Sequence, residues 1–125
     1  MEFGGKEALH FIGVGGVGMS GIARVAKDQG FRVSGSDLRG SRYTQQLEEA
    51  GIDVFIGQRA ENIPEGDVTV VVSTAILDNN PELMEAHRRG DEVEDAVRRA
   101  FPQVKEVLVH IEPVGADETA RGKTV

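Results

Sequence analysis

The sequence of 125 residues contains no cysteine and no tryptophan, and aromatic residues make up only 5% of it. Without cysteine, the chain can form neither a disulfide nor a thiolate metal site. No apolar stretch approaches the roughly 20 residues that a membrane-spanning helix needs. The first residues, MEFGGKEA, also lack the basic and apolar regions of a signal peptide. We therefore expect a soluble, cytoplasmic protein that does not contact a membrane.

Positive charge is scarce as well. The 14 Lys and Arg residues are outnumbered by 21 Asp and Glu residues, which gives a formal net charge of -7. Binding to a nucleic-acid backbone needs clustered basic residues, so this balance argues against a nucleic-acid partner. It does not argue against a single diphosphate held by backbone amides. The length suits one compact domain over residues 1–125.

Apolar runs alternate with helical patterns along most of the chain. The runs at 8–14, 31–37, 52–57, 68–76 and 104–113 predict strands. Helical spacing predicts helices over 18–28, over 43–51, and from Pro81 to about Phe101, the last as one helix or two nearly collinear pieces. This alternation predicts an α/β fold, a Rossmann-like parallel sheet of about five strands with helices on both faces. Residues 114–125 are polar and are expected to be a frayed tail.

Glycines at Gly13, Gly15 and Gly18 form a G-x-G-x-x-G pattern between the first predicted strand and the first predicted helix. An acidic residue, Asp37, ends the second predicted strand 19 residues after Gly18. In this context the pattern indicates a backbone loop that binds a phosphate at a helix N-terminus. The alternative is a strand–helix turn that binds nothing. From these residues alone the first candidate ligand is a nicotinamide dinucleotide, with Asp37 on a ribose hydroxyl.

Three longer motifs occur in order: HFIGVGGVGMSGIARVA, VSGSD and STAILDNNPELMEA. Together they resemble the N-terminal domain of UDP-N-acetylmuramate–L-alanine ligases, which are Mur ligases of peptidoglycan (cell-wall) synthesis, over about residues 8–89. The resemblance implies binding of UDP or UDP-N-acetylmuramate with no required cofactor. The residues that it implies for the nucleotide site are Gly13, Gly15, Gly16, Val17, Gly18, Met19, Ser36, Asp37, Ser73, Thr74 and Ala75. Two positions depart from the family pattern: Gln58 stands where histidine is frequent, and Thr74 replaces a second serine.

The sequence offers no candidate catalytic residues. The segment ARGKTV at 120–125 resembles the end of a P-loop, but that motif requires a glycine where Asp117 stands. In the family, ATP, Mg²⁺ and the amino acid are bound by central and C-terminal domains, which would not fit in 125 residues. We therefore expect substrate binding without turnover.

The segment from about His87, AHRRGDEVEDAVRRAFPQVKEVLVHIEPVG, resembles the cytoplasmic C-terminal domain of cation diffusion facilitators. It suggests a chimera in which residues 90–113 are a transporter-like helix–strand unit. The resemblance implies that His87, His110 and Glu112 could bind Zn²⁺, although a structural zinc site wants four ligands. Over a metal site we favour the alternative that His110 and Glu112 are a partly exposed histidine and glutamate at the end of an edge strand. For His10 we favour a packed core position.

An apolar run predicts a strand that is buried on both faces and added in parallel at the sheet edge: Val107, Leu108, Val109 and Ile111. In such a strand, a charge at Val109 would cost several kcal/mol of stability. Three other functions stay open at this point: a nicotinamide-dinucleotide domain, a metal-binding or dimerisation module, and a chimeric fold with no ligand.

Overall fold

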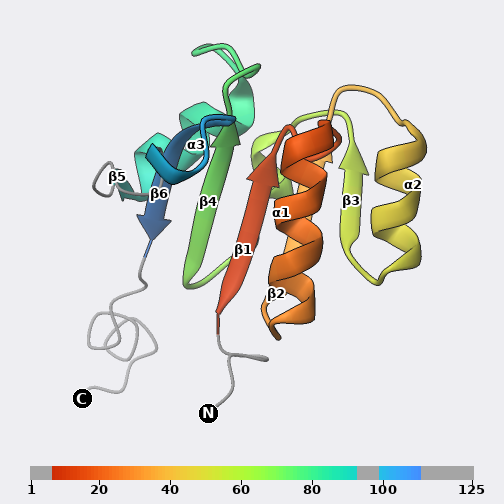
Figure 1. Cartoon of the computed structure of the whole chain (residues 1–125). Coiled ribbons are helices and arrows are strands. Elements are labelled where there is room, and N and C mark those ends of the chain that lie inside the picture. The colour runs from red at the N-terminus through yellow and green to blue at the C-terminus, as the bar shows by residue number, and fades with distance from the viewer. Residues whose placement is uncertain (1–6, 93–98, 111–125) are drawn as a thin grey trace.

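A computed structural model describes residues 7–92 and 99–110, which form one six-stranded sheet with flanking helices (Figure 1). The strands lie in the order β3-β2-β1-β4-β6-β5. Their bounds are Ala8–Ile12 (β1), Arg32–Asp37 (β2), Asp53–Ile56 (β3), Val68–Ser73 (β4), Asp91–Glu92 (β5) and Val104–His110 (β6). The helices are Val17–Asp28 (α1), Arg42–Glu49 (α2), the 3-10 turn Ala60–Asn62 (η1) and Pro81–Arg89 (α3). Within these described ranges, no helix is both long and apolar enough to cross a membrane.

The first four strands form the parallel sheet that the alternating pattern predicts. β1 lies at the centre and pairs in parallel with β2 on one side and β4 on the other, while β3 pairs in parallel with β2. The sequences ALHFI and VTVVVS of β1 and β4 are nearly continuous apolar runs. Such runs are typical of strands covered on both faces. The single α/β domain with a Rossmann-like sheet is confirmed.

Helices cover both faces of the sheet, as predicted. Because successive side chains of a strand point to opposite faces, each strand contributes to two separate hydrophobic clusters. On the face that carries α1, which crosses the viewer's side of the sheet in Figure 1, the cluster includes Phe11, Val71, Met19, Ala23 and Leu47. On the face that carries α3, it includes Ile12, Val70, Leu83, Ala86 and Leu108.

The last strand docks beside β4 as expected, but the predicted parallel direction is wrong. β6 runs antiparallel to β4, with Val70 opposite Leu108. The short β5 is antiparallel to β6 and therefore parallel to β4. The crossover from β4 through α3 thus leads into β5, and β6 returns in the opposite direction to fill the space between β4 and β5.

An unbroken helix to about Phe101 is also wrong, because α3 ends at Arg89. At Gly90 the chain passes directly against β6, where a Cβ would lie 2.6 Å from the carbonyl oxygen of Val109. The chain therefore enters the sheet at this point and forms β5. Of the predicted apolar run in β6, Val107 and Leu108 are buried and Val109 is half-buried; the penalty expected for a charge at Val109 stays a prediction. Ile111 and the predicted tail at 114–125 lie outside the described residues.

Candidate functional site

A cleft of about 480 Å³ lies where the carboxyl ends of the four parallel strands meet. In open α/β sheets this edge is where ligands bind, beside the point at which the strand order reverses. Here the order reverses at β1, since the chain continues on one side through β2 and β3 and then crosses to β4 on the other. The residues that line the cleft follow the ends of these strands: Gly13, Gly15, Gly16, Asp37, Leu38, Arg39, Gly40, Ser41, Gln58, Ser73, Ala75 and Ile76.

The glycine-rich loop makes the tight turn that its sequence predicts. Gly13 has a φ of +87°, a conformation that side chains disfavour, and its amide and that of Val14 both donate to the carbonyl oxygen of Ser36 at 2.9 Å. The amide of Gly15 donates to Oδ2 of Asp37 at 2.8 Å. A Cβ at Gly15 would lie 2.8 Å from that same oxygen, so any side chain here would displace the Asp37 carboxylate.

The N-terminus of α1 is built differently from those of the other two α-helices. α2 begins with a capping box in which Ser41 accepts from backbone amides, and Asn80 caps α3 in a similar way. The N-cap residue of α1 is Gly16, which has no side chain that could cap the helix, and the first turn of α1 contains no acidic residue. Helix N-terminal amides of this kind have no partner within the helix and carry a partial positive charge. They can bind an anion.

The cleft brings together six of the residues predicted for the nucleotide site: Gly13, Gly15, Gly16, Asp37, Ser73 and Ala75. The other five do not line it. Met19 is 2% exposed and packs in the α1 cluster, Ser36 is fully buried, and Val17 is exposed. A Cβ at Gly18 would meet the side chain of Gln103, and the amide of Thr74 donates to the carbonyl oxygen of Gln103.

Sequence reasoning missed the loop between β2 and α2. Leu38, Arg39, Gly40 and Ser41 line the cleft, as do Ile76 and Gln58, which the sequence marked only as a departure from a pattern. Their position directly after strand ends is the signal that could have found them. The VSGSD motif also contains Gly35, where a Cβ would lie 2.7 Å from Cβ of Val14. That glycine lets β2 pack closely against the start of the glycine-rich loop.

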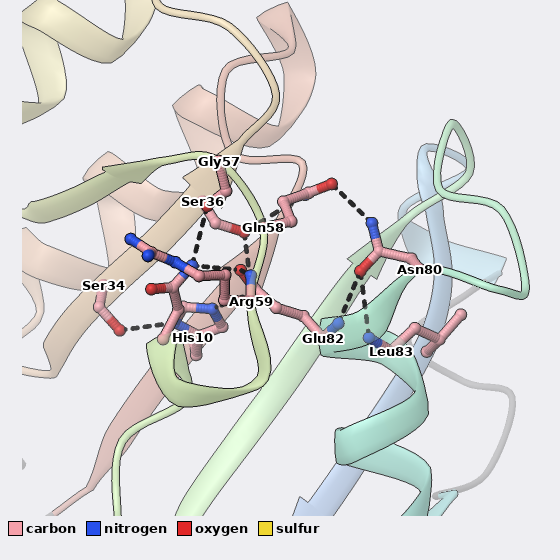
Figure 2. Close-up of polar contacts among 10 residues, drawn as sticks. His10, Ser34, Ser36, Gly57, Gln58, Arg59, Asn80, Glu82 and Leu83 are labelled. Carbon is pink, nitrogen blue, oxygen red and sulfur yellow. Dashed lines mark hydrogen bonds and ion pairs between the residues drawn. The ribbon is translucent and has the colours of Figure 1, made fainter.

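Beneath the cleft lies a buried polar network centred on Glu82, in the first turn of α3 (Figure 2). Its side chain is fully buried. Oε1 lies 2.7 Å from Nε2 of His10 and accepts from the Ser36 hydroxyl at 2.8 Å. Oε2 accepts from the Arg59 amide at 3.2 Å and from Nδ2 of Asn62 at 2.6 Å. The core position expected for His10 is confirmed, whereas its partner Glu82 was not foreseen.

The two histidines considered for Zn²⁺ have different hydrogen-bond partners. Nε2 of His87 lies 2.5 Å from Oε1 of Glu106, and Nδ1 of His110 lies 2.5 Å from the carbonyl oxygen of Arg89. Glu112 is outside the described residues. In the part of the chain that the structure describes, no group of three or more histidine, aspartate or glutamate side chains is placed to hold a metal ion.

Comparisons with known proteins identify relatives of this chain. Residues 8–103 match the family described as "Mur ligase family, catalytic domain". The UDP-N-acetylmuramate–L-alanine ligase of Geobacter sp. (strain M21) is 54% identical over 87 residues, which are 70% of this chain and 19% of that protein. The ligase of the same name from Paracoccus denitrificans is 55% identical over 92 residues, 74% of this chain and 18% of that protein.

A solved structure is similar as well. The crystal structure of UDP-N-acetylmuramate–alanine ligase MurC from Thermotoga maritima superposes with a TM-score of 0.60 at 32% identity, over 65% of this chain and 19% of that one. The chain spans about a fifth of the length of the curated relatives that it matches. The family match continues to residue 103, so these comparisons give no support to a junction near His87 or to a transporter-like tail.

Proposed function

This chain belongs to the Mur ligase family, and we propose that its cleft binds UDP as the nucleotide end of UDP-N-acetylmuramate. The observation that carries the proposal is the uncapped N-terminus of α1, which opens onto a cleft built by the glycine-rich loop. The names of the similar ligases reported above supply the substrate class. The cleft volume of about 480 Å³ falls within the usual range for small-molecule sites.

The charges around the cleft favour one orientation of the nucleotide. The diphosphate is placed against the amides that begin α1, after Gly16, where the helix dipole is positive. The carboxylate of Asp37 would repel a phosphate beside it, but it accepts well from a ribose hydroxyl. Arg39 lines the same cleft and adds a positive charge at its rim. Phosphates at α1 and ribose at Asp37 therefore form the arrangement that these groups support.

The ligation of L-alanine, which the relatives' names state, is a property of proteins about five times as long as this chain. We propose that the matching segment contributes binding of the nucleotide sugar, because its cleft presents glycine backbone, amides and hydroxyls suited to holding a ligand. A nicotinamide dinucleotide remains the rival ligand for the same loop. The family match favours the uridine nucleotide.

Titration of the ¹⁵N-labelled chain with UDP, followed by NMR, tests this function. We expect shifts at Gly15, Gly16 and Asp37, and we expect NAD to produce weaker shifts at the same concentrations. Gly15→Ala should weaken UDP binding more than about tenfold, because its Cβ would displace the Asp37 carboxylate.

Gly21→Ala, in the helix α1 that follows this loop, is the matched control, since nothing lies within 4 Å of its added Cβ. It should bind UDP as wild type does. Equal binding by both variants, or tighter binding of NAD than of UDP, would show that the assignment is wrong.

A further inference from the structure

We propose that Glu82, a carboxylate buried beneath the cleft, is a positioning residue that holds the side-chain amide of Gln58 with one N–H available to the bound nucleotide. The inference rests on the proposed function, because it takes the bound nucleotide to be UDP. Glu82 is fully buried and does not itself line the cleft. It acts through Ser36, whose hydroxyl lies between Glu82 and Gln58 (Figure 2).

The cap of α3 fixes the orientation of the Asn80 amide and, through it, the orientation of the Gln58 amide. The backbone amides of Glu82 and Leu83 donate to Oδ1 of Asn80 at 2.9 and 3.2 Å. A backbone amide can only donate, so the capping atom of Asn80 is its oxygen and the other branch is the NH₂ group. That NH₂ lies 2.6 Å from Oε1 of Gln58. The atom of Gln58 that faces Asn80 is therefore an oxygen, and its nitrogen lies on the opposite branch.

That nitrogen connects Gln58 to the buried carboxylate. Nε2 of Gln58 donates to the Ser36 hydroxyl at 3.3 Å, and this hydroxyl donates in turn to Oε1 of Glu82 at 2.8 Å. The second carboxylate oxygen already accepts from Arg59 and Asn62. Glu82 thus provides acceptors to the Arg59 and Asn62 groups, which can only donate, and to the Ser36 hydroxyl, which donates at this contact. Because Oε1 of Glu82 accepts from the Ser36 hydroxyl, the hydroxyl keeps one orientation, and the Gln58 amide bonded to it does so too.

The orientation matters because Gln58 belongs to the cleft wall. It lines the main cleft and also an adjoining one of about 390 Å³, which continues past Leu77 and Asn79. The NH₂ group has two protons, and within the described chain only the contact with Ser36 uses one of them. The second N–H can donate to an acceptor oxygen of the nucleotide.

Three variants of the 125-residue chain separate this role from a purely structural one. Glu82→Gln keeps the shape but replaces one carboxylate oxygen by an NH₂ group, so either the Ser36 hydroxyl or the Arg59 and Asn62 donors lose their acceptor. Ser36→Ala removes only the hydroxyl that links Glu82 to Gln58. Ser34→Ala is the matched control: Ser34 is a buried serine in the same strand that contacts His10 at the far side of the network.

Two measurements follow. The side-chain NH₂ resonances of Gln58 should shift and exchange faster with solvent in Glu82→Gln and Ser36→Ala, and should be unchanged in Ser34→Ala. UDP affinity should fall about fivefold in the first two variants, the size of one ordinary hydrogen bond, and by less than about twofold in the control.

A double-mutant cycle with Gln58→Ala completes the test. If Glu82 acts through Gln58, adding Glu82→Gln to Gln58→Ala should weaken UDP binding by less than about twofold more. Additive losses, or unchanged Gln58 resonances in Ser36→Ala, would overturn the inference. If Glu82→Gln does not fold, the comparison of Ser36→Ala with Ser34→Ala still decides it. Failure of the wild-type chain to bind UDP would instead refute the proposed function, while the Gln58 resonances still report on positioning.

Discussion

Replacement of Leu108 by alanine tests whether β6 is an integral part of this domain. Leu108 is 3% exposed and packs in the cluster on the α3 face, opposite Val70 of β4 and together with Leu83 of α3. Leu→Ala at such a site removes buried methyl groups and leaves a cavity, at a cost of about 2–5 kcal/mol. Because a domain of this size has about 5–15 kcal/mol of stability, we expect Leu108→Ala to lose a large fraction of it.

Urea denaturation followed by circular dichroism measures this loss, with Val109→Ala as the control. Val109 is adjacent in the same strand but only half-buried. We expect it to lose about 1 kcal/mol or less, because less apolar surface is returned to water. A loss below about 1 kcal/mol for Leu108→Ala would show that β6 is an appendage, and equal losses at the two positions would show that the burial of the two side chains does not decide their contributions.

Three further predictions concern single interactions. Gly35→Ala should destabilise the chain by about 1–3 kcal/mol in urea, because its Cβ would lie 2.7 Å from that of Val14, and an unchanged midpoint would contradict this packing. Ser41→Ala should lose about 1 kcal/mol in the same assay through its cap on α2, and a neutral result would show that the cap is dispensable. The hydrogen bond from Lys105 lowers the pKa of the Asp78 carboxyl, so this pair stabilises the fold at neutral pH and its contribution is lost as the pH falls through that pKa. Lys105→Met should raise the pKa of Asp78 toward its ordinary value in an NMR titration, and an unmoved pKa would refute the pairing.

The parallel half of the sheet could be predicted because its signals are local. The apolar runs of β1 and β4, and the glycines that follow β1, lie within a few residues of the structures they form. The turn at Gly13 followed from the same short motif. Such signals do not depend on distant parts of the chain.

The direction of β6 could not be predicted, because it depends on contacts between distant residues. An apolar run has the same pattern whether its strand is parallel or antiparallel. What decides the direction is the end of α3 at Gly90, where the chain meets the carbonyl oxygen of Val109. The apolar spacing continues past Gly90 in the sequence, so the pattern favoured a longer helix than the one that forms.

The candidate site was half predictable for a similar reason. Residues whose backbone forms the site, such as Gly15 and Gly16, were found from their motif. Glu82 could not be found, because an exposed-looking glutamate in a helical first turn is a common pattern. Three elements other than its own helix each bring one hydrogen-bonding group to it: His10 from β1, Ser36 from β2 and Asn62 from η1.

The position of this network explains why a buried carboxylate can influence a surface cleft. Ser36 uses its two polar groups in opposite directions: its carbonyl oxygen accepts from the amides of Gly13 and Val14, and its hydroxyl donates to Glu82. The residue at the end of β2 therefore joins the glycine-rich loop to the centre of the network. Since Gln58 is bonded to the same hydroxyl, the loop that would hold the phosphates and the amide that would contact the nucleotide share one anchor. Removing the hydroxyl at that anchor should therefore alter the Gln58 contact while the backbone hydrogen bonds of the loop stay in place, whereas a change at Ser34, on the far side of His10, should alter neither.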